Sequence, residues 1–100
     1  MTACIPLTRE MLRDPIDLDV REEPLDFARA RAHADRRARE AAAEPMLLAW
    51  YNRDRGEASP QVPCCGEAKP GWLTYAESRG GDLFIDINRE AYVFVYRRTL

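Results

Sequence analysis

The sequence predicts an α+β domain in which an antiparallel sheet of three to five strands carries one or two helices packed on one face. Three observations support this class: a helical pattern over residues 24–43, an apolar run over 46–51, and two alternating runs between 83 and 96. With 100 residues, 46% of them hydrophobic, the chain has the size of one domain spanning 1–100.

Residues 1–23 are mixed in character and are expected to be irregular or to hold one short strand. In "PIDLDV", at 15–20, apolar side chains alternate with two aspartates, Asp17 and Asp19. This alternation is typical of a half-buried strand.

The clearest predicted helix covers residues 24–43, with Pro24 at its first position and Pro45 beyond its last turn. The residues on its apolar side are almost all alanine and form one stripe: Phe27, Ala30, Ala34, Ala38 and Ala41. Small side chains allow close approach, so the helix should lie flat on a sheet or against a symmetry mate. The opposite side carries arginines, for which a solvated face with Asp35–Arg39 and Arg36–Glu40 ion pairs is expected.

Three further segments complete the expected sheet and its second helix. Met46 to Tyr51 should form a strand, and the residues toward Val62 a hairpin partner that Pro60 confines to the sheet edge. Residues 70–79 fit a helix that ends at Gly80 better than they fit a strand, although both remain open. The runs at 83–87 and 92–96 predict two antiparallel strands joined by a tight turn at "NRE".

Charge and cysteine content restrict the class of partner and the compartment. The formal net charge is −2, which gives no field that would attract nucleic acid or an anionic membrane, so neither partner is expected. The N-terminal residues lack an apolar core of secretory length, and the three cysteines do not make a disulfide framework. A cytoplasmic protein with reduced thiols is therefore predicted.

The adjacent cysteines of "CCGEAKPGW", at 64–72, are the one candidate for covalent chemistry. Neighbouring Cα atoms lie about 3.8 Å apart, too close for a relaxed disulfide, so Cys64 and Cys65 are expected to be free thiols. A helix end near Pro70, with Lys69 or Arg79, would lower a thiol pKa. The alternative is that both cysteines simply pack in a loop.

The remaining candidate residues flank this loop. Trp72 and Tyr75 either line a small pocket or belong to the core, and Arg79 is the arginine best placed to bind an anion or a carboxylate. No four residues have the spacing of a zinc site, and no motif for a cofactor or a catalytic triad is present, so no metal and no cofactor are predicted. Four carboxylates are expected to lie on polar, solvent-exposed strand faces and to mark no catalytic motif: Asp17, Asp19, Asp82 and Asp86.

Four segments together resemble a family of short prokaryotic proteins of unknown function, found notably in anaerobes and sulfate reducers. The segments are "EPMLLAWYN", "CCGEAKPGW", "YAESRGGDLFIDIN" and "YVFVYRR", within residues 44–98. The resemblance implies a compact α+β domain without established activity, cofactor or catalytic residues.

The leading functional hypothesis is a small binding or interaction module, expected to form a homodimer and to take a small-molecule ligand near the cysteine loop. The alanine stripe and an exposed edge of the "YVFVYRR" strand are the two surfaces predicted for self-association. The alternative hypothesis is a thiol-dependent enzyme or redox sensor that uses Cys64 or Cys65.

Overall fold

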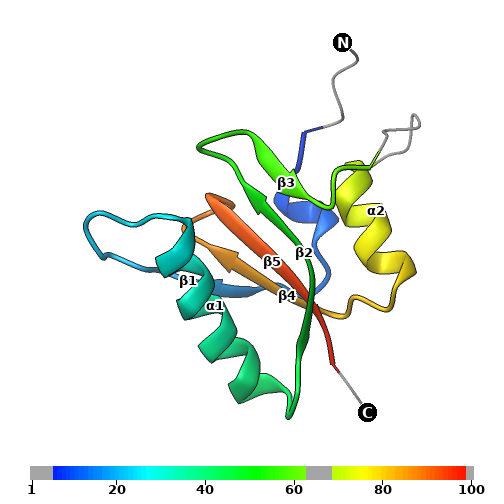
Figure 1. The fold of residues 1–100 in the computed structure, drawn as a ribbon, viewed down its shortest axis with the longest axis horizontal. Coiled ribbons are helices and arrows are strands. Elements are labelled where there is room, and N and C mark those ends of the chain that lie inside the picture. The colour runs from blue at the N-terminus through cyan, green and yellow to red at the C-terminus, as the bar shows by residue number, and fades with distance from the viewer. Residues whose placement is uncertain (1–5, 63–68, 99–100) are drawn as a thin grey trace.

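The computed structural model describes residues 6–62 and 69–98, and these form one five-stranded sheet with helices on both faces (Figure 1). The strand order is β1-β4-β5-β2-β3, in which β1 runs parallel to β4 and all other neighbours are antiparallel. The strands are β1 (Ile16–Leu18), β2 (Met46–Asn52), β3 (Glu57–Ser59), β4 (Leu83–Ile87) and β5 (Tyr92–Arg97). The predicted α+β class is thereby confirmed.

The two α-helices, α1 (Phe27–Ala41) and α2 (Gly71–Ser78), pack on opposite faces of the sheet, which corrects the expectation that the helices share one face. The reason lies in the central strands β4 and β5, which are apolar on both sides. Their two sets of alternating side chains contact different helices. The α1 face is formed by Leu83, Ile85, Ile87, Tyr92, Phe94 and Tyr96, and the α2 face by Phe84, Val93 and Val95.

The helix α1 begins three residues later than Pro24, because Asp26 caps it: the Asp26 side chain accepts a hydrogen bond of 2.9 Å from the Arg29 amide. Its stripe residues Ala30, Ala34 and Ala38 have no exposed surface and pack on β4 and β5. The stripe therefore serves contact within the chain, and the prediction that it is a self-association surface is wrong.

The strand of "YVFVYRR", β5, lies between β4 and β2 and so has no free edge, which also overturns the second predicted self-association surface. The sheet instead ends at β1 and β3. The short strand β3 stops at Ser59, directly before Pro60, as the predicted edge position requires.

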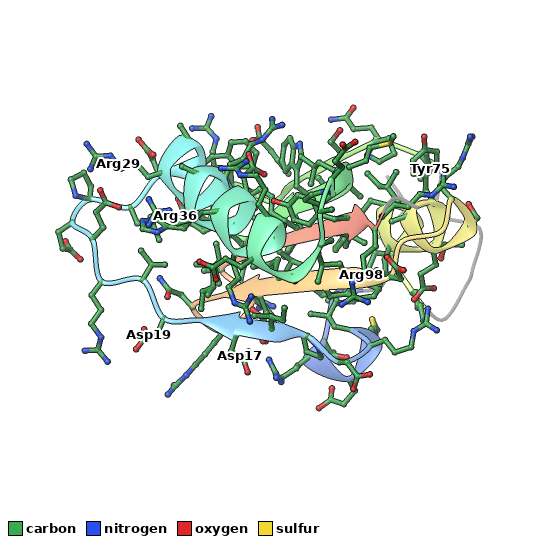
Figure 2. The ribbon with its side chains drawn as sticks, turned by 90° about the horizontal axis from the view of Figure 1, so that it is seen from below. Asp17, Asp19, Arg29, Arg36, Tyr75 and Arg98 are labelled. Atoms are coloured by element: carbon green, nitrogen blue, oxygen red, sulfur yellow. The ribbon has the colours of Figure 1, made fainter. Side chains whose placement is uncertain are left out.

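Residues 71–78 form a helix, α2, as the helical alternative predicted. A 3-10 helix, η1 (Arg9–Met11), and its neighbours Leu7 and Leu12 cover the same face of the sheet as α2. Figure 2 shows α1 and η1 on opposite sides of the strands. No helix among residues 6–62 and 69–98 is long and apolar enough to cross a membrane.

Candidate functional site at the β1 edge

Residues 18–22, which begin with the last residue of β1, run along the edge of the sheet and are here called the strap. The side chain of Asn88 holds the strap at Val20. Asn88 accepts a hydrogen bond of 2.8 Å from the Val20 amide through Oδ1, and its Nδ2 donates one of 3.0 Å to the Val20 carbonyl. The Asn88 amide also donates to the Leu18 carbonyl at 2.9 Å. The position of the strap therefore depends on the turn that holds Asn88.

That turn joins β4 to β5 and has an uncommon backbone. Asn88, Arg89 and Glu90 all adopt positive φ angles, of 53°, 57° and 64°, although none of them is glycine. The Asp86 side chain supports this conformation, because its Oδ1 accepts a hydrogen bond of 2.6 Å from the Glu90 amide. Three successive left-handed residues store conformational energy, which such contacts must offset.

Asp86 has no exposed surface, so the expectation that solvent explains this carboxylate is wrong. Its Oδ2 accepts a hydrogen bond of 2.9 Å from Arg9 Nη1, and Arg9 also binds both carboxylate oxygens of Asp17. Burial raises the pKa of Asp86 to about 7, with a further increase from the neighbouring Glu90 carboxyl and an opposing effect of Arg9. Asp86 therefore exchanges its proton in the neutral pH range.

Two open grooves meet at the strap. The first, of about 810 Å³, lies between the strap and α1 and is called the α1 groove. The second, of about 770 Å³, lies between the strap and the β4–β5 turn and includes Arg9 and Glu90. Figure 2 shows Arg29 and Arg36 at α1 and Asp17 and Asp19 at the β1 edge. The α1 groove carries five basic side chains: Arg21, Arg29, His33, Arg36 and Arg37.

Most of these basic side chains have an acidic neighbour. Glu22 lies 3.0 Å from His33 Nε2 and 3.8 Å from Arg29 Nη1, and Arg21 pairs with Asp19 at 2.8 Å. Ion pairs of this kind at the surface contribute little stability and exchange partners readily.

Arg36 is the exception, because neither of the predicted i,i+4 ion pairs on α1 forms. Glu40 binds Arg37 at 3.5 Å. Asp35 instead accepts a hydrogen bond of 2.6 Å from the Tyr96 hydroxyl and pairs with Arg31. Within the part of the chain that the structure describes, the Arg36 guanidinium thus has no carboxylate partner.

The charge of the molecule is unevenly distributed. The helix α1 contains five arginines against two acids, Asp35 and Glu40, a local charge of +3 with His33 neutral. Because the whole chain carries −2, all other residues together carry −5. The exposed side of α1 is therefore a basic surface on an otherwise acidic protein.

The predicted candidate residues lie away from this site. Cys64 and Cys65 fall outside the described residues. Lys69 donates to both carboxylate oxygens of Glu77, at 2.8 and 2.9 Å. Trp72 is buried and stacks on Tyr51 with 5.5 Å between ring centroids.

Among the candidates that the structure describes, Arg79 and Tyr75 contact each other: the Arg79 guanidinium lies 4.8 Å from the centre of the Tyr75 ring. In the described segments, no three side chains of histidine, cysteine, aspartate or glutamate come together as metal ligands.

The residues that sequence reasoning missed are Arg9, Asp86, Asn88 and Glu90. One signal was available, because "LFIDI" places an aspartate inside an otherwise continuous apolar run. Such a run is typical of a central strand that is buried on both faces, where a carboxylate needs specific partners.

Comparison with known proteins identifies relatives without an assigned activity. A family model described as a domain of unknown function, DUF5619, matches residues 13–96. An uncharacterised protein from Archaeoglobus fulgidus is 41% identical over 49 residues, which is 49% of this chain and 52% of that protein, so the match spans about half of its length. The predicted resemblance to a short uncharacterised prokaryotic family is confirmed.

A solved structure shares the fold. The crystal structure of protein AF1514 from Archaeoglobus fulgidus, described as novel, superposes with a TM-score of 0.73 at 28% sequence identity. The match covers 89% of this chain and 98% of that one.

Proposed function

The chain belongs to the DUF5619 family, whose function is unknown, and we propose that this member is a binding module that holds small anionic molecules in its α1 groove. One observation carries the proposal: Arg36 lines a groove of about 810 Å³ without a carboxylate partner among the described residues, while four other basic side chains surround it. The +3 charge of α1 favours the approach of an anion.

Arginine suits this task because its planar guanidinium donates two parallel hydrogen bonds to a carboxylate or a phosphate. The walls of the groove are also well fixed. One wall is a helix packed on the sheet, and the other is the strap that Asn88 holds through both backbone groups of Val20. An anion that enters can displace Glu22 from Arg29, since their separation of 3.8 Å makes this a weak pair.

Citrate and inorganic pyrophosphate are suitable probes, measured by isothermal titration calorimetry at low ionic strength. We expect binding of at least one probe, and Arg36→Ala should weaken it by a factor of about 10 to 100, because a charged hydrogen bond contributes about 1.5 to 3 kcal/mol. Arg13→Ala is the matched control, since Arg13 is exposed and lines neither groove.

The control should leave the affinity unchanged. Absence of binding at millimolar probe, or equal losses in the Arg36 and Arg13 variants, would contradict the proposal, because a general charge effect would then explain the data.

Self-association and thiol chemistry remain separate predictions. Partial support for a dimer comes from β2, whose first residues pair with β5 but not with β3, and from Met46, which is 50% exposed there. Light scattering that gives a monomer mass at micromolar concentration would exclude it.

The thiol hypothesis is supported by the start of α2 at Gly71, six residues after Cys65 in the sequence. Alkylation of Cys64 and Cys65 that titrates near pH 8.5 would argue against activated thiols.

A further inference from the structure

We infer that the α1 groove binds an elongated dianion at two separate points. The first point is Arg36, and the second lies between Arg29 and His33, where the structure places the carboxylate of Glu22. The ligand class is a linear molecule with an anionic group at each end and an apolar chain between them. This inference rests on the proposed function and adds to it the spacing of the two charges and the part that Glu22 plays.

Three basic side chains of the groove form one row along α1. Arg29, His33 and Arg36 follow one another at intervals of four and three residues, so they lie on the same side of the helix. Figure 2 shows Arg29 near the start of α1 and Arg36 further along it. With a rise of about 1.5 Å per residue, Arg36 lies about 7.5 Å along the helix axis from the midpoint of Arg29 and His33. The row therefore offers two anion positions that a short anion cannot occupy together.

The side chain of Glu22 shows that the second point accepts a carboxylate. Its Oε1 lies 3.0 Å from His33 Nε2, and its Oε2 lies 3.8 Å from Arg29 Nη1. Arg29 also donates a hydrogen bond of 2.9 Å to the Pro24 carbonyl, which keeps its guanidinium in place when Glu22 leaves. The Glu22 side chain is 40% exposed, and exposed ion pairs exchange partners readily. Glu22 is therefore a competitor within the chain that a ligand carboxylate replaces.

The groove also has apolar lining, which favours a carbon chain between the two charges. Leu18 and Val20 of the strap and Ala32 of α1 line it beside the basic residues, and a methylene chain gains by covering such surface. An extended chain advances about 1.2 Å per bond. Pimelate, with six bonds between its carboxyl carbons, spans about 7 Å and matches the spacing of the two points. Malonate, with two such bonds, spans about 2.4 Å and reaches one point only.

Pimelate and malonate are both dianions at neutral pH and differ in length, so they separate two-point binding from one-point binding. Each is titrated into ¹⁵N-labelled protein at low ionic strength, and the side-chain Nε–Hε signals of Arg29 and Arg36 are followed by NMR. We expect pimelate to shift both signals and to bind at least about fivefold more tightly than malonate, because it makes a second charged contact. In Arg36→Ala the preference for pimelate should disappear, because one of the two points is lost.

The role of Glu22 is tested with Glu22→Gln, which removes the competing charge and should strengthen pimelate binding by about two- to fivefold, as expected for a surface ion pair. Glu23→Gln is the matched control, because Glu23 is the next residue, is exposed and lines neither groove. It should change the affinity less.

Two results would overturn the two-point inference: equal affinities of the wild type for pimelate and malonate, or equal gains in the Glu22 and Glu23 variants. The anion proposal survives either result if Arg36→Ala still weakens binding. If pimelate, malonate, citrate and pyrophosphate all fail to bind at millimolar concentration, the anion proposal and the two-point inference are both refuted.

Discussion

Replacement of Phe94 by alanine is expected to lower the free energy of unfolding by about 3 to 5 kcal/mol. Phe94 is fully buried in β5, the middle strand of the sheet, at the point where α1 packs on it. Its ring lies 5.6 Å from that of Phe27 at the start of α1, and its strand neighbours in register are Ile85 and Trp50. Truncation leaves a cavity that these neighbours cannot fill, because a sheet between two helical layers has little freedom to collapse.

Urea denaturation followed by circular dichroism measures this loss as a shift of the midpoint at constant slope. Met46→Ala is the control. It also removes a large apolar side chain from the sheet, but one that is 50% exposed. The control should cost well under half as much as Phe94→Ala. A loss below about 1 kcal/mol for Phe94→Ala would show that the described α1 face is not the principal core.

Replacement of Asp86 by asparagine is expected to remove most of the pH dependence of stability between pH 4 and pH 8. In the folded protein, burial raises the pKa of Asp86 from the ordinary value of 3.8 to about 7. The native state therefore binds a proton more tightly than the unfolded chain does. The stabilisation is complete below pH 4 and is lost as the pH rises through 7.

The loss through this group is on the order of 4 kcal/mol, because a tenfold change in proton affinity corresponds to about 1.4 kcal/mol. Between pH 5 and pH 8, the difference between the wild-type and Asp86→Asn unfolding free energies should change by about 3 kcal/mol, because this interval covers about two of the three units between the two pKa values. Asp82→Asn is the control, since Asp82 is exposed and directly precedes the same strand. A wild type that gains stability relative to Asp86→Asn from pH 5 to pH 8 would have the wrong sign and would refute the raised pKa.

Much of the fold could be predicted from local patterns. The alternation at 15–20, the alanine stripe of 24–43 and the two runs around "NRE" correspond to β1, α1 and the β4–β5 hairpin. Strand order could not be predicted in the same way, because it depends on pairing between segments far apart in the chain. The alternating pattern also did not reveal that β5 is buried on both faces. Tyrosine and phenylalanine lie on one side of this strand and valine on the other, and that pattern fits a strand with one buried face as well as a strand with two.

The candidate site was largely beyond sequence reasoning. Asn88 and Glu90 were visible only as a break between two strands, and nothing local indicates that Asn88 reaches Val20, 68 residues earlier. Arg9 belongs to a segment that was expected to be irregular, yet it contacts Asp86 across 77 residues. Such contacts follow from the parallel pairing of β1 with β4, which no short motif specifies.

The parallel pairing of β1 with β4 also determines when the grooves can exist during folding. Ile16 pairs with Ile85, so a loop of nearly seventy residues must close before β1 joins the sheet. The β4–β5 hairpin and the helix α1 need only local contacts and can form early. We therefore expect the strap and the two grooves beside it to form only when β1 docks, after the rest of the sheet is in place.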